Sequence, residues 1–170
     1  MSRLQLFFLG SPRLERGGEP LEIDTRKTIA LVAYLAVTGQ AHSRDALATL
    51  LWPESEPRRA RSILRRNLSV LNKTLDGPWL AADRETIGLN PNANLWLDVD
   101  QFHQHLQNWQ GHKHPESEVC GDCLSDLGKA VTLYRDDFLA GFTLRDSPQF
   151  DEWQTFQTEY FRRELAGALE

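Results

Sequence analysis

The spacing of apolar residues predicts a short sheet at the start of the chain, followed by three helices. Residues 3–24 contain three β-prone stretches, two of them joined by the turn pair Gly17-Gly18, so we expect a small antiparallel sheet there. Apolar residues then recur at helical spacing over residues 26–38, over residues 43–52 and over residues 58–75. The first 75 residues are therefore expected to combine strands and helices.

A hairpin is expected directly after the third helix. Residues 79–82 and 86–89 are two short strand patterns, and Asp83-Arg84-Glu85 lies between them. The order of sheet, three helices and hairpin is that of a winged helix-turn-helix with an extra N-terminal antiparallel sheet. The second and third helices would form the helix-turn-helix pair, and the hairpin would be the wing. We expect this α+β domain to cover residues 1–96.

The second half of the chain, residues 97–170, follows a turn-rich joint at residues 90–94 and shows a series of helical patterns. A polar loop is expected at residues 111–119, and a glycine break at Gly141 is expected before a last helix from about residue 149. The apolar residues of this half form stripes such as Phe102 and Leu106, and the paired patterns are typical of helical-repeat (TPR-like) domains. No stop signal beyond a single glycine closes the last pattern. We therefore expect an all-α domain at residues 97–170 that is incomplete at its C-terminus.

The helix expected at residues 58–75 has an apolar face and a basic face. Its apolar stripe consists of Leu64, Leu68, Leu71 and Leu75, and its other side carries Arg61, Ser62, Arg65, Arg66, Ser69, Asn72 and Lys73. No Asp or Glu occurs between residues 58 and 74, whereas a solvated face usually mixes both signs, because acid–base pairs at i, i+4 stabilise helices. Such a face suits phosphates and base edges in a DNA major groove, and an ordinary solvated basic helix is the alternative.

The charge of the chain is divided between its halves. Residues 1–96 contain 13 Lys and Arg against 10 Asp and Glu, a net charge of +3. Residues 97–170 contain 6 against 14, a net charge of −8, which brings the whole chain to −5. This division favours a basic nucleic-acid reader followed by an acidic module. It also raises the hypothesis that the acidic half shields the basic helix until DNA or a partner arrives.

The candidate DNA contacts come from the third helix, from the start of the second helix and from the hairpin. Arginine side chains on the third helix suit bidentate contacts to guanine O6 and N7 or to phosphates. The free backbone N–H groups at a helix start attract a phosphate, and an arginine at the hairpin tip suits the minor groove. The candidates are Ser43, Arg44, Arg58, Arg59, Arg61, Ser62, Arg65, Arg66, Ser69, Asn72, Lys73, Arg84 and Thr86.

Six segments of the chain form a recognisable set: LVAYLA at 31–36, SRDALATLLWP at 43–53, ARSILRRNLSVLNKTL at 60–75, LDVDQFHQHL at 97–106, AVTLYRDDFLAGF at 130–142 and DSPQFDEW at 146–153. In their order and spacing these segments resemble the SARP-type bacterial transcriptional activators. The Trp-Pro stop ahead of the basic helix is fairly specific to the family, and YRDDFLAGF is more specific still. The insertion at residues 110–123 and the position of Asn67 beside the buried stripe depart from the family pattern.

The resemblance implies a response-regulator-like winged helix followed by the helical bacterial transcriptional activator domain. It implies a sequence-specific regulator, expected to be an activator, that binds double-stranded promoter DNA, often at direct repeats. The helical domain is expected to contact RNA polymerase or a second copy of the chain, as a dimer on direct repeats. The alternative is a protein-interaction or oligomerisation module of a larger signalling ATPase, with weak or no DNA binding.

A cluster of histidine and cysteine residues suggests a structural zinc site. Its residues are His112, His114, Cys120 and Cys123. These ligand types and the C-x-x-C spacing suit tetrahedral zinc, which would stabilise a polar loop. Alternatively, Cys123 is not a ligand and is simply a small apolar residue buried in the core. His103 and His105 are alternative candidates for zinc ligands. A disulfide is not expected, because the sequence suggests the cytoplasm, where thiols are kept reduced.

The sequence does not favour a membrane-spanning protein, a secreted protein or an enzyme. No run of about 20 apolar residues occurs, so no membrane-spanning segment is expected. Two cysteines and the absence of an export signal suggest the reducing cytoplasm. No Walker A, G-x-S-x-G or H-E-x-x-H motif is found, and Asp136-Asp137 beside a turn suits capping better than catalysis, so the chain is not expected to be an enzyme.

Overall fold

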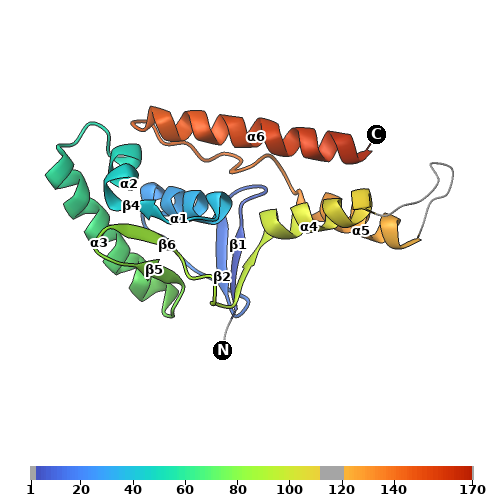
Figure 1. The fold of residues 1–170 in the computed structure, drawn as a ribbon, viewed down its shortest axis with the longest axis horizontal. Coiled ribbons are helices and arrows are strands. Elements are labelled where there is room, and N and C mark those ends of the chain that lie inside the picture. The colour runs from blue at the N-terminus through green and yellow to red at the C-terminus, as the bar shows by residue number, and fades with distance from the viewer. Residues whose placement is uncertain (1–2, 112–120, 170) are drawn as a thin grey trace.

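The computed structural model describes residues 3–111 and 121–169, a mixed α+β fold with small sheets and helices (Figure 1). Helix α6 (Pro148–Leu169) runs along one side of the molecule, beyond α1 (Arg26–Thr38) and α2 (Arg44–Leu51). Helix α3 (Pro57–Leu75) lies at one end, together with the hairpin formed by β5 (Leu80–Ala82) and β6 (Thr86–Leu89). Helices α4 (Asp98–Gly111) and α5 (Gly121–Leu133) lie toward the other end (Figure 1). No helix in the described residues is long and apolar enough to cross a membrane.

The N-terminal sheet has four strands in the order β3-β2-β1-β7. They are β1 (Leu4–Phe7), β2 (Arg13–Arg16), β3 (Glu19–Pro20) and β7 (Leu95–Leu97). The first three pair antiparallel, as expected, but β7 pairs with β1 in parallel and joins the sheet from about 90 residues further along the chain. The antiparallel pairing predicted for residues 3–24 is therefore confirmed, whereas the parallel fourth strand was not predicted, because a three-residue strand is too short to give a periodic signal.

The three helices that follow have the expected positions. They are α1 (Arg26–Thr38), α2 (Arg44–Leu51) and α3 (Pro57–Leu75). Gly39 ends α1 in the left-handed conformation with a φ of 66°, which a residue without a Cβ adopts without strain. The Ser43 hydroxyl caps α2 by accepting a hydrogen bond from the backbone N–H of Ala46. Pro57 begins α3, where its missing N–H costs no helical hydrogen bond.

A second sheet has three strands in the order β4-β6-β5, of which β4 precedes α2 and the other two follow α3. Its strands are β4 (His42–Ser43), β5 (Leu80–Ala82) and β6 (Thr86–Leu89). The predicted hairpin is thus present, and its turn is closed by the Asp83 carboxylate, which accepts from the backbone N–H groups of Glu85 and Thr86. Strand β4 had not been predicted, because two residues carry no periodicity. It links the start of α2 directly to the hairpin.

The second half contains α4 (Asp98–Gly111), α5 (Gly121–Leu133) and α6. Residues 134–147 between α5 and α6 are not helical, in agreement with the glycine break that the sequence predicts at Gly141. This segment returns to the N-terminal sheet, where Phe138 forms bridges with Leu9 and Gly10 and the backbone N–H of Leu139 donates to the carbonyl of Phe8. Leu139 and Gly141 have left-handed φ angles of 51° and 76°, a turn that helical periodicity does not reveal.

One hydrophobic core runs through both halves of the chain. Phe8, Phe102, Phe138, Phe150 and Phe161 are fully buried and belong to it. Polar contacts join the halves beside this core. Ser147 Oγ donates to the Leu51 carbonyl at 2.9 Å, and Lys27 Nζ lies 3.1 Å from an Asp146 oxygen. These contacts attach the start of α6 to α1 and to the end of α2.

Candidate nucleic-acid interface

Helix α3 buries its apolar stripe and exposes its basic face. Leu64, Leu68, Leu71 and Leu75 are each at most 5% exposed, and Ala60 extends this stripe toward the start of the helix. Every candidate contact on α3 is exposed, namely Arg58, Arg59, Arg61, Ser62, Arg65, Arg66, Ser69, Asn72 and Lys73. The acidic half does not cover these side chains in the described residues, so the shielding hypothesis does not describe this structure.

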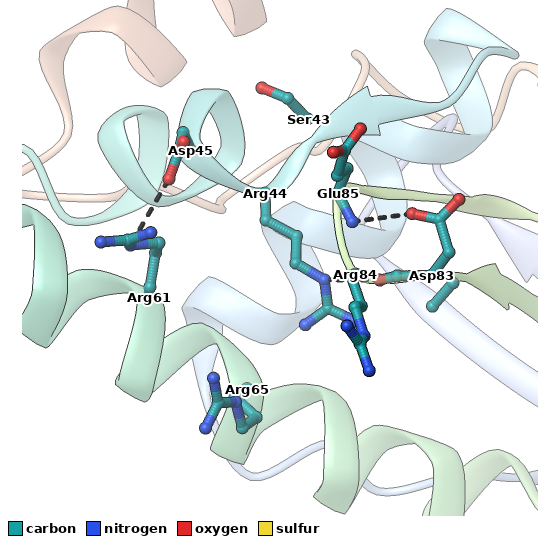
Figure 2. Close-up of a pocket in the computed structure, with 9 residues that line it drawn as sticks. Ser43, Arg44, Asp45, Arg61, Arg65, Asp83, Arg84 and Glu85 are labelled. Atoms are coloured by element: carbon teal, nitrogen blue, oxygen red, sulfur yellow. Dashed lines mark hydrogen bonds and ion pairs between the residues drawn. The ribbon is translucent and has the colours of Figure 1, made fainter.

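An open cleft of about 890 Å³ lies between α2, α3 and the β5–β6 hairpin. Arg61 and Arg65 of α3, Arg44 of α2 and Arg84 of the hairpin turn all line it, with Ser43 at its edge (Figure 2). Arg61 and Arg65 are four residues apart and therefore lie one above the other on the same side of the helix. Four guanidinium groups from three elements thus converge on one concave surface.

Carboxylates share this cleft, and the sequence pattern of α3 did not reveal them. Asp45, the second residue of α2, places Oδ1 3.5 Å from Arg61 Nε. The Arg44 Nε donates to the backbone carbonyl of Asp83 at 2.8 Å. Backbone N–H groups of Thr86 and Glu85 lower the pKa of Asp83, so this carboxylate stays ionised at neutral pH. The sequence of α3 itself contains no carboxylate beside these arginines. In the folded protein, however, carboxylates of α2 and of the hairpin turn lie next to them.

Two of the predicted hydroxyl contacts already have structural partners. The Ser43 hydroxyl caps α2, and the backbone N–H of Arg44 donates to the Glu85 carbonyl at 2.8 Å. The Thr86 hydroxyl donates to the carboxylate of Asp83. Ser43 and Thr86 thus hold the start of α2 and the hairpin turn in place, while the arginines beside them stay partly or fully exposed.

The predicted zinc ligands fall mostly outside the described residues. His112, His114 and Cys120 belong to the segment that the structure does not describe, and Cys123 lies on α5. Within the described residues, no cluster of three or more metal-ligating side chains occurs. Of the alternative ligands, His105 instead contacts Asp126, with 2.9 Å between Nδ1 and Oδ1. The zinc site remains a prediction from the sequence.

Comparison with known proteins shows a shared fold. No protein-family model and no curated protein matches the chain. Among solved structures, Mycobacterium tuberculosis EmbR in complex with a low-affinity phosphopeptide matches 99% of this chain with a TM-score of 0.70 and 23% sequence identity. The chain spans 46% of that EmbR chain. The chain therefore shares its fold with that part of EmbR.

Proposed function

We propose that this protein is a sequence-specific, double-stranded DNA-binding transcriptional regulator of the SARP type, acting as an activator. Residues 1–96 would be its winged-helix DNA-binding domain, and residues 97–170 its helical activator domain. In this proposal α3 enters the major groove, and the turn of the β5–β6 hairpin, residues 83–86, reaches the neighbouring minor groove as the wing. The fold shared with EmbR is consistent with this assignment.

The convergence of cationic side chains around α3 is the single observation that carries the proposal. The exposed face of α3 is basic along its length, and Arg44 and Arg84 extend it over α2 and the hairpin. A helix with a basic outer face beside a basic turn matches the major groove and the adjacent backbone of B-DNA. Lys73 near the last turn and Arg58 at the start extend the phosphate-binding surface to both ends of the helix.

The helical half is proposed to contact RNA polymerase or a second copy of the chain bound to a direct repeat. Its net charge of −8 would disfavour contact with DNA and leave its surfaces free for protein partners.

A second candidate function is a protein-interaction module with little DNA affinity, inside a larger signalling ATPase. The cleft between α2, α3 and the hairpin is also lined by three carboxylates, those of Asp45, Asp83 and Glu85. They favour this alternative, because they reduce the net positive charge of the cleft.

Selection of genomic duplex fragments by the full chain, followed by fluorescence anisotropy on the best fragment, tests the proposal. We expect sequence-selective binding whose affinity falls steeply with salt, because phosphate contacts release counterions. The double variant Arg65→Ala/Arg66→Ala should lose at least tenfold in affinity, since a base-contacting arginine contributes about 1–3 kcal/mol.

Arg163→Ala is the matched control, because Arg163 is an exposed helical arginine on α6. This variant should bind the selected fragment as the unmodified chain does. Equal loss of affinity in both variants would point to a general charge effect. Absence of duplex binding at low salt would contradict the proposal and favour the interaction module.

A further inference from the structure

Asp45 places a negative charge where a DNA-binding helix pair would be expected to attract phosphate. It lies in the first turn of α2, and its side chain is 76% exposed. Its Oδ1 lies 3.5 Å from Arg61 Nε, and the Arg61 side chain is 52% exposed (Figure 2). A carboxylate at this position repels the phosphate that a helix N-terminus otherwise attracts. Asp45 therefore opposes binding that depends on the DNA backbone alone.

The chemistry of the two side chains fits the edges of one base pair. A contact through Nε leaves both terminal Nη groups of Arg61 free, and these match the O6 and N7 acceptors of guanine. A carboxylate accepts a hydrogen bond from the N4 amino group of cytosine. Guanine and cytosine present these groups side by side in the major groove. The Asp45–Arg61 pair is thus complementary to a G·C base pair and poorly suited to A·T.

We propose that Asp45 is a specificity-determining residue that orients Arg61 toward guanine, accepts from the paired or neighbouring cytosine, and disfavours other duplex DNA. This inference rests on the proposed DNA-binding function. The exposure of both side chains allows them to meet a base pair without rearrangement of α2 or α3. Arg65, one turn further along α3 in the same cleft, is left to contact the adjacent base pair or phosphate.

Selection from a randomised double-stranded DNA pool, carried out with the unmodified chain and with Asp45→Asn, tests this role. We expect the unmodified chain to select a G·C pair at one fixed position. Asp45→Asn should weaken that preference about tenfold. It should also bind a shuffled duplex several-fold more tightly, because one repulsive charge has been removed. A merely structural role for Asp45 would change the melting temperature without changing which base is selected.

Asp76→Asn is the matched control. Asp76 is exposed and ends α3 at its other end with a φ of 47°, a conformation that asparagine tolerates. This variant loses the same charge but should leave the selected sequence unchanged. Identical base preference in the unmodified chain and in Asp45→Asn would overturn the role of Asp45 while leaving the DNA-binding function intact. No binding of any duplex by the unmodified chain would overturn both.

Discussion

Asp98 is a buried carboxylate that joins the helical half to the N-terminal sheet. It is 1% exposed and accepts hydrogen bonds from the backbone N–H groups of Phe8 and Leu9 at 2.9–3.0 Å. Burial raises the pKa of Asp98, and the hydrogen bonds offset part of that effect. Asp98 is the first residue of α4, and it satisfies two backbone donors just after β1 ends.

Asp98→Ala should therefore destabilise the fold. The two backbone donors would be left buried without an acceptor, at a cost of about 1–3 kcal/mol each. We expect a decrease of roughly 2–6 kcal/mol in the free energy of unfolding, measured by urea denaturation. Asp100→Ala, an exposed neighbour in the same first turn, is the control. A change under about 0.5 kcal/mol for Asp98→Ala would contradict this role.

The Asp137–Arg162 ion pair should make stability sensitive to acid. Hydrogen bonds from Arg162 hold the pKa of Asp137 below its ordinary value of 3.8. A lowered folded-state pKa contributes stability that is present above the unfolded value and is lost as pH falls through the folded value. Asp137→Asn should be less stable than the unmodified chain at pH 6, and this deficit should shrink as pH falls below about 3.8. A deficit that is the same at pH 6 and at pH 2.5, measured by thermal melting, would refute the prediction.

Helices were the elements that the sequence predicted best. The stripes of α1, α2 and α3, together with the Ser43 cap and the Gly39 stop, specify helices locally. Strands β4 and β7 were missed because their pairing partners lie far along the chain and their two or three residues show no alternation. In the same way, the basic face of α3 could be read from sequence, whereas Asp45 opposite Arg61 required the packing of α2 against α3.

The turn of the β5–β6 hairpin should contribute separately from α3. Arg84 lies at its tip and is exposed. If Arg84 enters the minor groove, Arg84→Ala should reduce the slope of log affinity against log salt by about one and weaken the preference for A·T pairs beside the major-groove site. Anisotropy on fragments with A·T or G·C flanks measures both effects. An unchanged slope and an unchanged flank preference would show that the turn does not contact DNA.

At the scale of the whole molecule, contacts join the two halves of the chain across the predicted boundary. Strand β7, Asp98 and Phe138 all contact the first residues of the chain, and the core continues from one half into the other. The sequence pattern suggested a boundary near residue 96 because composition changes there, but composition carries no information about contacts across that point. Residues 8–10, which directly follow β1, are thus contacted by Asp98, Phe138 and Leu139, all of which come after this boundary.

Residues 1–96 alone should consequently be less stable than the full chain. Removal of the second half would leave Phe8 and Leu9 without their covering contacts and would delete the last residue of β7. We expect a thermal transition, followed by circular dichroism, that is broader and at lower temperature than that of the full chain. A sharp transition at the same temperature would mean that the first half is an independent folding unit.

Dimethyl sulfate protection on the selected DNA fragment tests the proposed DNA-binding mode most directly. This reagent methylates guanine N7 in the major groove and adenine N3 in the minor groove, so one experiment reports on both grooves. With α3 in the major groove and the hairpin in the minor groove, we predict protection of guanine N7 at the centre of the site and of adenine N3 beside it. The guanine protection should disappear with Arg65→Ala/Arg66→Ala and persist with Arg163→Ala. A bound fragment with no protected guanine N7 would contradict the placement of α3 in the major groove.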